Sequence, residues 1–278
     1  MFVVTFPNCK INIGLNIVGK REDGFHNLET VFYPLPLYDC LEIITLANNN
    51  TEPAITTSGL SVDGAVADNI CIKAWHLLKK DFLQLPAVDA YLHKAIPLGA
   101  GLGGGSADGA FMLKLLNEKY NLQLSQQQLI EYALQLGSDC PFFIINQPAF
   151  GTGRGELLQP LNLDLSAYYF VIINPAIHVN TGWAFKQLQI QIPPHSLIKA
   201  IQQPVDTWKN TVVNDFERAV TAQYPVIAQI KAILYMQGAV YASMTGSGST
   251  VFGLFAEKPA LPFFPEEYLV KIIPPKRA

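Results

Sequence analysis

The stretch that decides the fold is Pro97-Leu98-Gly99-Ala100-Gly101-Leu102-Gly103-Gly104-Gly105-Ser106-Ala107-Asp108-Gly109-Ala110, with five glycines in seven consecutive residues, 99–105. An apolar segment typical of a strand, 91–96, precedes it, and a helix-forming run from Ser106 to Tyr120 follows it. Glycines let backbone N–H groups approach a ligand closely, and a helix N-terminus adds positive partial charge. The stretch therefore predicts a cradle for an anion, most often a phosphate, rather than a flexible surface loop.

Three phosphate-loop patterns compete for this stretch. The Walker pattern fails, because the closing residues 105–107 are Gly-Ser-Ala and contain no lysine. The dinucleotide pattern GxGxxG matches at Gly99, Gly101 and Gly104, but the acidic residue it requires falls in 116–122, which is predicted to be a helix end and loop. The third pattern, Pro-x-Gly-x-Gly-Leu-Gly-x-Gly/Ser-Ser/Ala, fits the whole segment.

Composition excludes several classes of protein. The 278 residues carry a net charge of −3 without a basic block, so nucleic acids and membranes are not expected as partners. The four cysteines have no metal-binding spacing and indicate reduced thiols rather than zinc ligands or disulfides. The N-terminus lacks a signal-peptide pattern, and no apolar run approaches the ~20 residues of a membrane span. We therefore expect a cytoplasmic location.

The order of elements indicates an α+β protein with a domain junction near Pro160, dividing the chain into 1–160 and 161–278. Asp68 is the expected N-cap of a helix over 69–82, and Ser125 with Gln128 forms a capping box for the next helix, which Gly137 ends. Further strands are expected at 11–18, 28–33, 41–46, 168–173, 241–244 and 251–255, a hairpin at 150–158, helices at 181–188 and 225–237, and loops at 189–194 and 258–265.

Two more motifs flank the glycine-rich stretch: Phe6-Pro7-Asn8-Cys9-Lys10-Ile11-Asn12-Ile13-Gly14-Leu15 and Met244-Thr245-Gly246-Ser247-Gly248-Ser249-Thr250-Val251-Phe252-Gly253. In this order, the three motifs resemble those of the GHMP kinases, the family of galactokinase, homoserine kinase and mevalonate kinase. The resemblance implies an N-terminal ATP-binding domain (1–160), a C-terminal ferredoxin-like domain (161–278) and an active site in the cleft between them.

Further segments narrow the resemblance to one branch of that family. Residues 20–30, 136–143 and 150–156 are similar to its RxDGYHxLxT, LGADVPFF and A-x-G-x-G-E stretches, with Phe25 in place of the usual tyrosine. This branch implies ATP-dependent phosphorylation of the 2-hydroxyl of 4-diphosphocytidyl-2-C-methyl-D-erythritol, in the methylerythritol phosphate route to isoprenoid precursors. A GHMP kinase of the homoserine or mevalonate-pathway type, or a nucleotide-binding regulator without catalysis, remains the alternative.

Asp139 and Lys10 are the candidate catalytic residues. Asp139 follows a predicted helix and precedes an apolar stretch, so it is either a base or a cap for the turn before Pro141. Lys10 lies in an apolar strand, where it is either a solvated edge charge or a partner of that carboxylate that stabilises the transferring charge. Asn12 shares the Lys10 face by the two-residue period and can bind the acceptor.

The resemblance implies aromatic contacts for the cytosine of the acceptor. Phe25 and Phe185 are the candidate walls of its site and His26 the candidate reader of its edge, although core packing is the alternative for each phenylalanine. Thr181 either binds the diphosphate or caps the helix that it begins.

The remaining candidate residues are expected to bind ATP. Mg²⁺ is expected to be held mainly by ATP, without a metal site on the protein. Ser106 can reach a phosphate oxygen or Mg²⁺ and can also cap its helix, whereas the helix dipole accounts for Asp108. Gly246 and Gly248 are expected to let the third motif pack against the glycine-rich stretch, and Cys140 is the cysteine expected to react. The expected ATP-binding set for the phosphates is Pro97, Leu98, Gly99, Ala100, Gly101, Leu102, Gly103, Gly104, Gly105, Ser106 and Ala107. The resemblance implies that Asn69, Ile70, Lys94 and Leu98 lie around the adenine.

Overall fold

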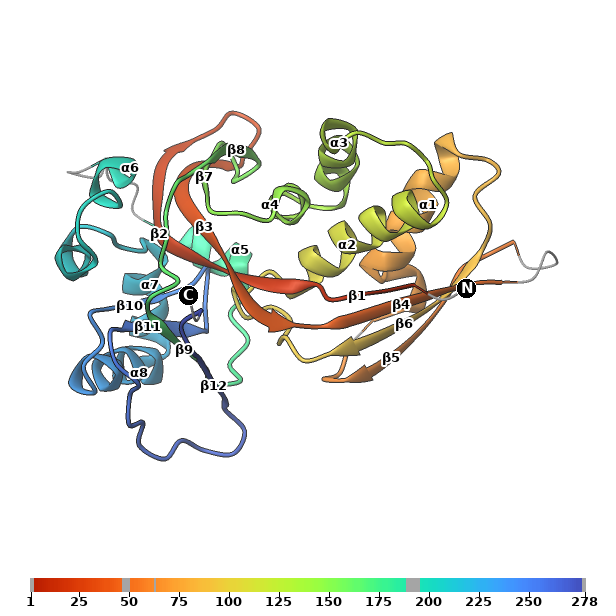
Figure 1. Ribbon diagram of the computed structural model, residues 1–278. Coiled ribbons are helices and arrows are strands. Elements are labelled where there is room, and N and C mark those ends of the chain that lie inside the picture. The colour runs from red at the N-terminus through yellow and green to blue at the C-terminus, as the bar shows by residue number, and fades with distance from the viewer. Residues whose placement is uncertain (1–2, 47–50, 63, 189–195, 277–278) are drawn as a thin grey trace. The chain divides into compact units, whose positions relative to one another are not determined.

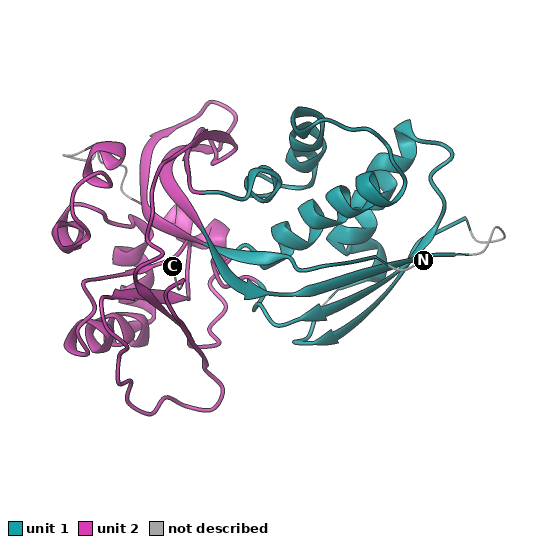
Figure 2. Cartoon of the chain, in the orientation of Figure 1, with its two compact units in different colours: residues 1–10, 34–98, 103–147 teal, residues 11–33, 99–102, 148–278 magenta. Residues whose placement is uncertain are grey.

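The computed structural model describes residues 3–46, 51–62, 64–188 and 196–276, and it divides into two compact units (Figure 2). Unit 1 comprises residues 1–10, 34–98 and 103–147, and unit 2 comprises residues 11–33, 99–102 and 148–278. The units are interleaved along the chain, so a single boundary near Pro160 does not describe them. The division into sequence domains 1–160 and 161–278 stays a prediction.

Unit 1 is a layer of helices on a four-stranded sheet (Figure 1). The sheet order is β1 (Val3–Thr5), β4 (Cys40–Thr45), β6 (Val88–Lys94) and β5 (Ala54–Gly59), with β5 parallel to β6 and the other pairs antiparallel. The helices are α1 (Ile70–Asp81), α2 (Gly104–Lys119), α3 (Gln126–Leu136) and α4 (Cys140–Ile145), with a short 3₁₀ turn, η1 (Val66–Asp68), before α1.

Local capping determines where these helices begin. The capping box at Ser125 and Gln128 is present, and Gly137 ends α3 as predicted. The predicted N-cap Asp68 is wrong, because Asp68 lies in η1 and the Asn69 side chain accepts the Cys71 N–H at 2.9 Å. A side-chain acceptor two residues before that N–H satisfies one of the donors left open at a helix start.

Unit 2 contains a second sheet built on two long strands, β2 (Asn8–Lys20) and β3 (His26–Tyr38), whose first or last residues belong to unit 1. The sheet continues with β7 (Ala149–Thr152) and β8 (Leu157–Pro160), which form the predicted hairpin. Strand β3 extends beyond the expected 28–33 through Pro34 and Pro36, residues that sequence reasoning takes as strand breakers.

The third sheet has the order β10 (Tyr241–Met244), β11 (Val251–Phe255), β9 (Tyr169–Asn174) and β12 (Leu269–Ile273), all antiparallel. Numbered within this domain, the order is second, third, first and fourth strand, as in a ferredoxin-like sheet, which confirms the expected α+β class. Helical segments of this unit are α5 (Thr181–Lys186), α6 (Leu197–Ala200), η2 (Val205–Asn210), α7 (Phe216–Gln223) and α8 (Pro225–Met236).

The core of unit 2 packs the inner face of this sheet against α7 and α8. Val171, Val251, Val220, Ile227 and Leu234 are almost completely buried there. Burying such a side chain contributes about 1.5–3 kcal/mol relative to leaving it exposed. The strands at 168–173, 241–244 and 251–255 were predicted from this apolar content and are confirmed.

The sequence analysis did not predict several short or polar elements, among them β1, β5, α7 and β12. Strand β5 carries mostly exposed residues and therefore no apolar alternation that could reveal it. The loop expected at 258–265 is irregular, and the one at 189–194 lies outside the described residues.

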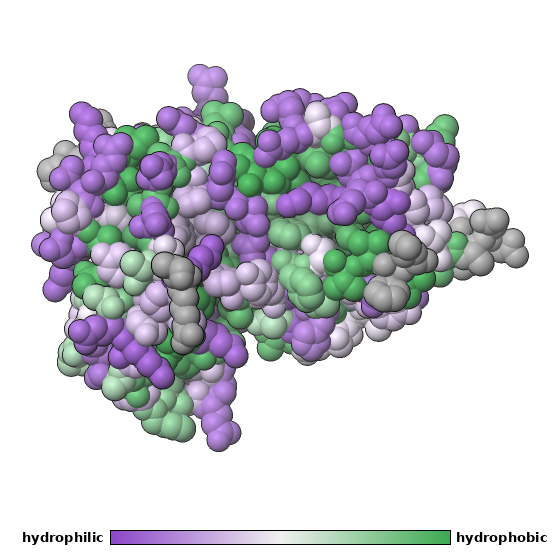
Figure 3. Space-filling model, viewed as in Figure 1, coloured by the Kyte–Doolittle hydropathy of each residue, from purple (hydrophilic) through white to green (hydrophobic). Residues whose placement is uncertain are grey.

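Figure 3 shows mostly hydrophilic colour over α3, whose buried residues are Leu129 and Ala133. Within the described residues, no helix is long and apolar enough to cross a membrane.

Candidate active site

The glycine-rich stretch forms a tight turn from β6 into α2. Gly99, Gly101 and Gly103 have φ values of +64°, +79° and +72°, which side chains with a Cβ rarely adopt. Gly103 is the N-cap residue and the helix begins at Gly104, two residues earlier than predicted. Ser106 therefore lies inside the first turn, and the expectation that it caps α2 is wrong.

The third motif packs closely against the unit 2 part of this stretch. A Cβ on Gly101 would lie 2.1 Å from the Thr245 carbonyl oxygen, and one on Gly246 would lie 3.1 Å from the Gly101 Cα. The Thr245 hydroxyl donates to the Gly101 carbonyl at 3.0 Å and accepts the Asn12 N–H at 2.9 Å. The predicted close packing is confirmed, and Thr245 is a contact that sequence reasoning missed.

Lys10 and Asp139 form an ion pair in unit 1. The Lys10 Nζ lies 3.4 Å from the Asp139 Oδ2, and the two side chains are 4% and 33% exposed. A Cβ on Gly103 would lie 3.0 Å from the Lys10 Cε, which places the lysine stem against the start of α2. Asp139 occupies the N-cap position of α4 but makes no side-chain capping bond among the described residues. The capping alternative is therefore not supported.

Asn12 follows Lys10 on β2 and is only 2% exposed. Its Nδ2 donates to the Thr30 hydroxyl at 2.9 Å, and that hydroxyl donates to the Gly14 carbonyl at 2.6 Å. These bonds fix the orientation of the Asn12 amide beside Thr245.

The predicted aromatic residues do not form two facing walls. His26 stacks on Phe185 with 4.9 Å between ring centroids, and Phe185 packs edge-on against Phe216. Phe25 is 53% exposed, and the Arg154 guanidinium lies 5.0 Å from its ring centroid. Burial lowers the pKa of His26, which favours the neutral imidazole.

Thr181 is the first residue of α5, but Asn180 caps that helix by accepting the Trp183 N–H at 2.8 Å. The Thr181 hydroxyl instead lies 2.9 Å from the Ser247 hydroxyl of the third motif. The capping alternative for Thr181 is therefore wrong.

A cavity of about 250 Å³ lies in unit 1 beside the start of α2. Its lining brings together the residues predicted around the adenine, Asn69, Ile70, Lys94 and Leu98, with Gly105 of the glycine-rich stretch. Ile55, Leu92 and Val66 add apolar surface. An apolar cavity with a few polar groups is typical of a site for a flat heterocycle.

Lys94 is completely buried and contacts two carboxylates. Its Nζ donates to Asp108 Oδ2 at 2.6 Å and, at shorter range, to Asp39 Oδ2. Asp39 Oδ1 accepts the N–H groups of Ala95 and Ile96 at 2.6 and 2.9 Å. The triad therefore ties the segment that enters the glycine-rich stretch to the second turn of α2.

Asp108 differs from its expected role. It is 2% exposed, and burial raises its pKa to about 7 despite the Lys94 ammonium. The helix-dipole explanation is wrong, because the side chain bonds Lys94. The sequence analysis missed Asp39, because its partner Lys94 lies 55 residues away in the sequence. The signal that could have revealed it is an acidic residue inside the apolar run 37–41.

The cysteines are free thiols, as expected. Cys140 is fully buried and burial raises its pKa to about 12, as it does for Cys9. The thiolate is the reactive form of cysteine, so burial and the raised pKa both oppose the expected reactivity of Cys140, which favours the buried-hydrophobe alternative.

Comparisons with known proteins identify the family of the chain. Models of the GHMP kinases N-terminal domain and of the GHMP kinases C-terminal domain match residues 69–153 and 197–266. A protein of Bacteroides fragilis named 4-diphosphocytidyl-2-C-methyl-D-erythritol kinase is 53% identical over 97% of this chain and 95% of its own length. A Porphyromonas gingivalis protein of the same name is 44% identical over 93% and 94%.

Solved structures are similar in fold. A crystal structure of 4-(cytidine 5'-diphospho)-2C-methyl-D-erythritol kinase superposes with a TM-score of 0.77, at 28% identity, covering 91% of this chain and 90% of that one. A homoserine kinase from Cytophaga hutchinsonii has a TM-score of 0.62 at 17% identity, covering 91% and 86%, and shares the fold.

Proposed function

Because the chain belongs to the 4-diphosphocytidyl-2-C-methyl-D-erythritol kinases of the GHMP kinase family, we propose that it phosphorylates the acceptor of that name. The γ-phosphoryl group of ATP passes to the 2-hydroxyl, giving the 2-phosphate and ADP. The reaction belongs to the methylerythritol phosphate route to isoprenoid precursors. Both substrates are small polar molecules, and we propose that the enzyme acts in the cytoplasm.

The Lys10–Asp139 pair beside Gly103 is the observation that carries the mechanism. Asp139 is the candidate base that accepts the proton of the acceptor hydroxyl, and its partial exposure leaves a carboxylate oxygen accessible. Lys10 orients that carboxylate and offsets the negative charge that develops on the transferring group.

The glycine-rich stretch is the proposed phosphate site. Its open backbone and the N-terminus of α2 favour an anion, and residues 97–107 would surround the β- and γ-phosphates. The 250 Å³ cavity is the proposed adenine site, formed by Asn69, Ile70 and Leu98 over the buried Lys94.

Mg²⁺ would supply charge neutralisation on the triphosphate. Within the described residues, no group of three His, Cys, Asp or Glu side chains could hold a metal ion. The Ser106 hydroxyl near the loop is an oxygen donor of the kind that suits Mg²⁺. Mg²⁺ is therefore proposed to bind mainly through ATP.

Asn12, Phe25, His26, Thr181 and Phe185 are the proposed acceptor-binding residues. We propose that neutral His26 offers a ring nitrogen to the edge of a cytosine and that Phe185, stacked on His26, adds an apolar contact to its ring. Base–aromatic stacking contributes about 1–3 kcal/mol per base.

The test is ATP consumption with purified protein and three acceptors: the cytidine-diphosphate-linked methylerythritol, homoserine and mevalonate. We expect turnover with the first acceptor alone, with phosphate on its 2-hydroxyl by ³¹P NMR. Turnover with homoserine or mevalonate would favour another GHMP kinase, and ATP binding without any turnover would favour the regulator.

A further inference from the structure

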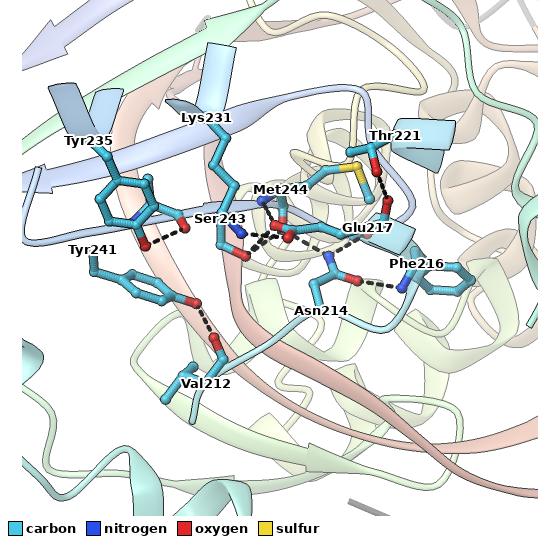
Figure 4. Close-up of polar contacts among 12 residues, drawn as sticks. Val212, Asn214, Phe216, Glu217, Thr221, Lys231, Tyr235, Tyr241, Ser243 and Met244 are labelled. Carbon is cyan, nitrogen blue, oxygen red and sulfur yellow. Dashed lines mark hydrogen bonds and ion pairs between the residues drawn. The ribbon is translucent and has the colours of Figure 1, made fainter. Parts of the chain in front are cut away.

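The segment Val212-Val213-Asn214-Asp215-Phe216-Glu217 joins η2 to α7 and is not used by the proposed mechanism. Figure 4 shows Asn214 and Glu217 of this segment beside Met244, at the end of β10 where the third motif begins. Asn214 and Glu217 together bind both backbone groups of Met244, the residue before Thr245.

Asn214 uses its whole amide in this contact. Its Nδ2 donates to the carbonyl oxygens of Met244 and Gly246 at 2.8 and 2.9 Å, and its Oδ1 accepts the Phe216 N–H at 3.0 Å. The residue is only 3% exposed, so water cannot easily take the place of a lost bond. Losing one of these bonds would leave a buried polar group without a partner, which is costly. The two carbonyls flank Thr245, so Asn214 fixes the backbone on both sides of that residue.

Glu217, in the first turn of α7, binds the backbone at the same residue, Met244. Its carboxylate accepts the Met244 N–H at 2.6 Å and the Ser243 hydroxyl at 2.9 Å, and Lys231 Nζ donates to it at 2.5 Å (Figure 4). Charge-assisted bonds of this kind are stronger than neutral ones.

The other side of the segment is bonded to β2. The Leu15 N–H donates to the Val213 carbonyl and the Asp215 N–H donates to the Leu15 carbonyl, both at 2.8 Å. The Asp215 carboxylate accepts the Ile17 N–H at 2.7 Å. The segment thus connects β2, which carries Asn12, to the third motif, whose Thr245 contacts Asn12 and Gly101.

We propose that Asn214, supported by Glu217, is a positioning residue for phosphoryl transfer. It holds Met244–Gly246 so that the Thr245 hydroxyl meets the Gly101 carbonyl of the phosphate loop and the Asn12 backbone. The inference rests on the proposed function, because it assigns the phosphate loop to ATP.

Asn214→Asp tests the inference with an isosteric change. The variant keeps the acceptor for the Phe216 N–H but loses both donors and puts a carboxylate oxygen against two carbonyls. We expect KM for ATP, and the ATP dissociation constant by calorimetry, to rise by about tenfold or more, the equivalent of losing one buried hydrogen bond at the loop. A purely structural role predicts a lower melting temperature with both ATP values unchanged, when these are measured below the onset of unfolding.

A control removes another bond beside the same segment. Tyr241→Phe deletes the 2.9 Å bond from the Tyr241 hydroxyl to the Val212 carbonyl. That bond does not involve Asn214, Glu217 or the Met244–Gly246 backbone, so the control should unfold at a lower temperature with KM for ATP unchanged.

An unchanged KM and dissociation constant for ATP in folded Asn214→Asp would overturn the inference. If that variant does not fold, Asn214→Ser removes the donors without adding charge, and the same two values decide. Absence of turnover in the wild type with the cytidine acceptor would reject the proposed function instead, while the ATP titrations would still report on the loop.

Discussion

Asp139 and Lys10 differ in burial, and at the scale of single residues this difference predicts different effects of mutation. Asp139→Asn changes a one-third exposed side chain and keeps its shape, so the fold should survive. Lys10→Ala empties a buried site beside Gly103 and Asp139, so it should lower both activity and stability.

We expect Asp139→Asn to lower kcat by about 10²–10⁴-fold, the usual contribution of a positioned base. The dissociation constant for ATP should change little, because the base acts on the acceptor hydroxyl. Steady-state kinetics and calorimetric titration with ATP measure the two effects. Asp81→Asn is the matched control, since Asp81 is exposed and bonds only the Tyr132 hydroxyl among the contacts described. Near-normal turnover in Asp139→Asn would remove the base assignment.

At the scale of elements, the turn from β6 into α2 depends on Gly103. Its φ of +72° is unfavourable for alanine, and the added Cβ would lie 3.0 Å from both the Lys10 Cε and the Phe143 Cζ. Gly103→Ala should therefore weaken ATP binding more than acceptor binding. Gly105→Ala should cost less, because it has helical geometry and its Cβ would meet only the Leu98 Cδ2 at 3.7 Å. Calorimetric titration of each ligand compares the variants, and equal losses in both would contradict the assignment of the turn to ATP.

The Lys94–Asp39–Asp108 triad makes the attachment of α2 depend on pH. The pKa of Asp108 is raised to about 7, above the value of about 3.9 in an unfolded chain. The folded protein therefore favours the protonated carboxyl more than the unfolded chain does. This raises the free energy of unfolding fully below about pH 4, and the gain is lost as the pH rises to about 7.

Asp108→Asn should remove that dependence, because asparagine resembles the protonated acid at every pH. Urea unfolding between about pH 4 and about pH 8 should show the wild type losing up to ~1.4 kcal/mol per pH unit relative to the variant. Parallel pH profiles for the two proteins would show that Asp108 ionises normally.

Features specified by residues close together in the sequence could be predicted. Features that depend on partners far away in the sequence could not. The capping box at Ser125 needs only residues three apart, and the spacing of the glycines in 99–105 predicted the turn into α2 from the sequence alone. Asp39 and Asn214 bond to groups 55 and 30 or more residues away, and such pairings depend on the folded topology. The third motif was recognised, but the segment that holds it was not.

At the scale of the whole molecule, the candidate residues for the two substrates lie mainly in different units. The proposed adenine cavity belongs to unit 1, whereas Phe25, His26, Thr181 and Phe185 belong to unit 2. The sequence motifs predicted both sets by resemblance. They did not predict the stacking of His26 on Phe185, because the ring geometry depends on how α5 packs against β3 and α7.

Phe185→Ala should therefore raise KM for the cytidine acceptor and leave KM for ATP nearly unchanged. The loss of one stacking partner corresponds to about 1–3 kcal/mol, or roughly 5- to 150-fold. The variant also loses the edge-on contact with Phe216, so some destabilisation is expected. Ile227→Ala is the matched control, because it opens the same core, and it should lower the melting temperature while KM stays constant for both substrates. A rise in KM for ATP instead would assign Phe185 to the nucleotide, and no change in either KM would assign it to the core alone.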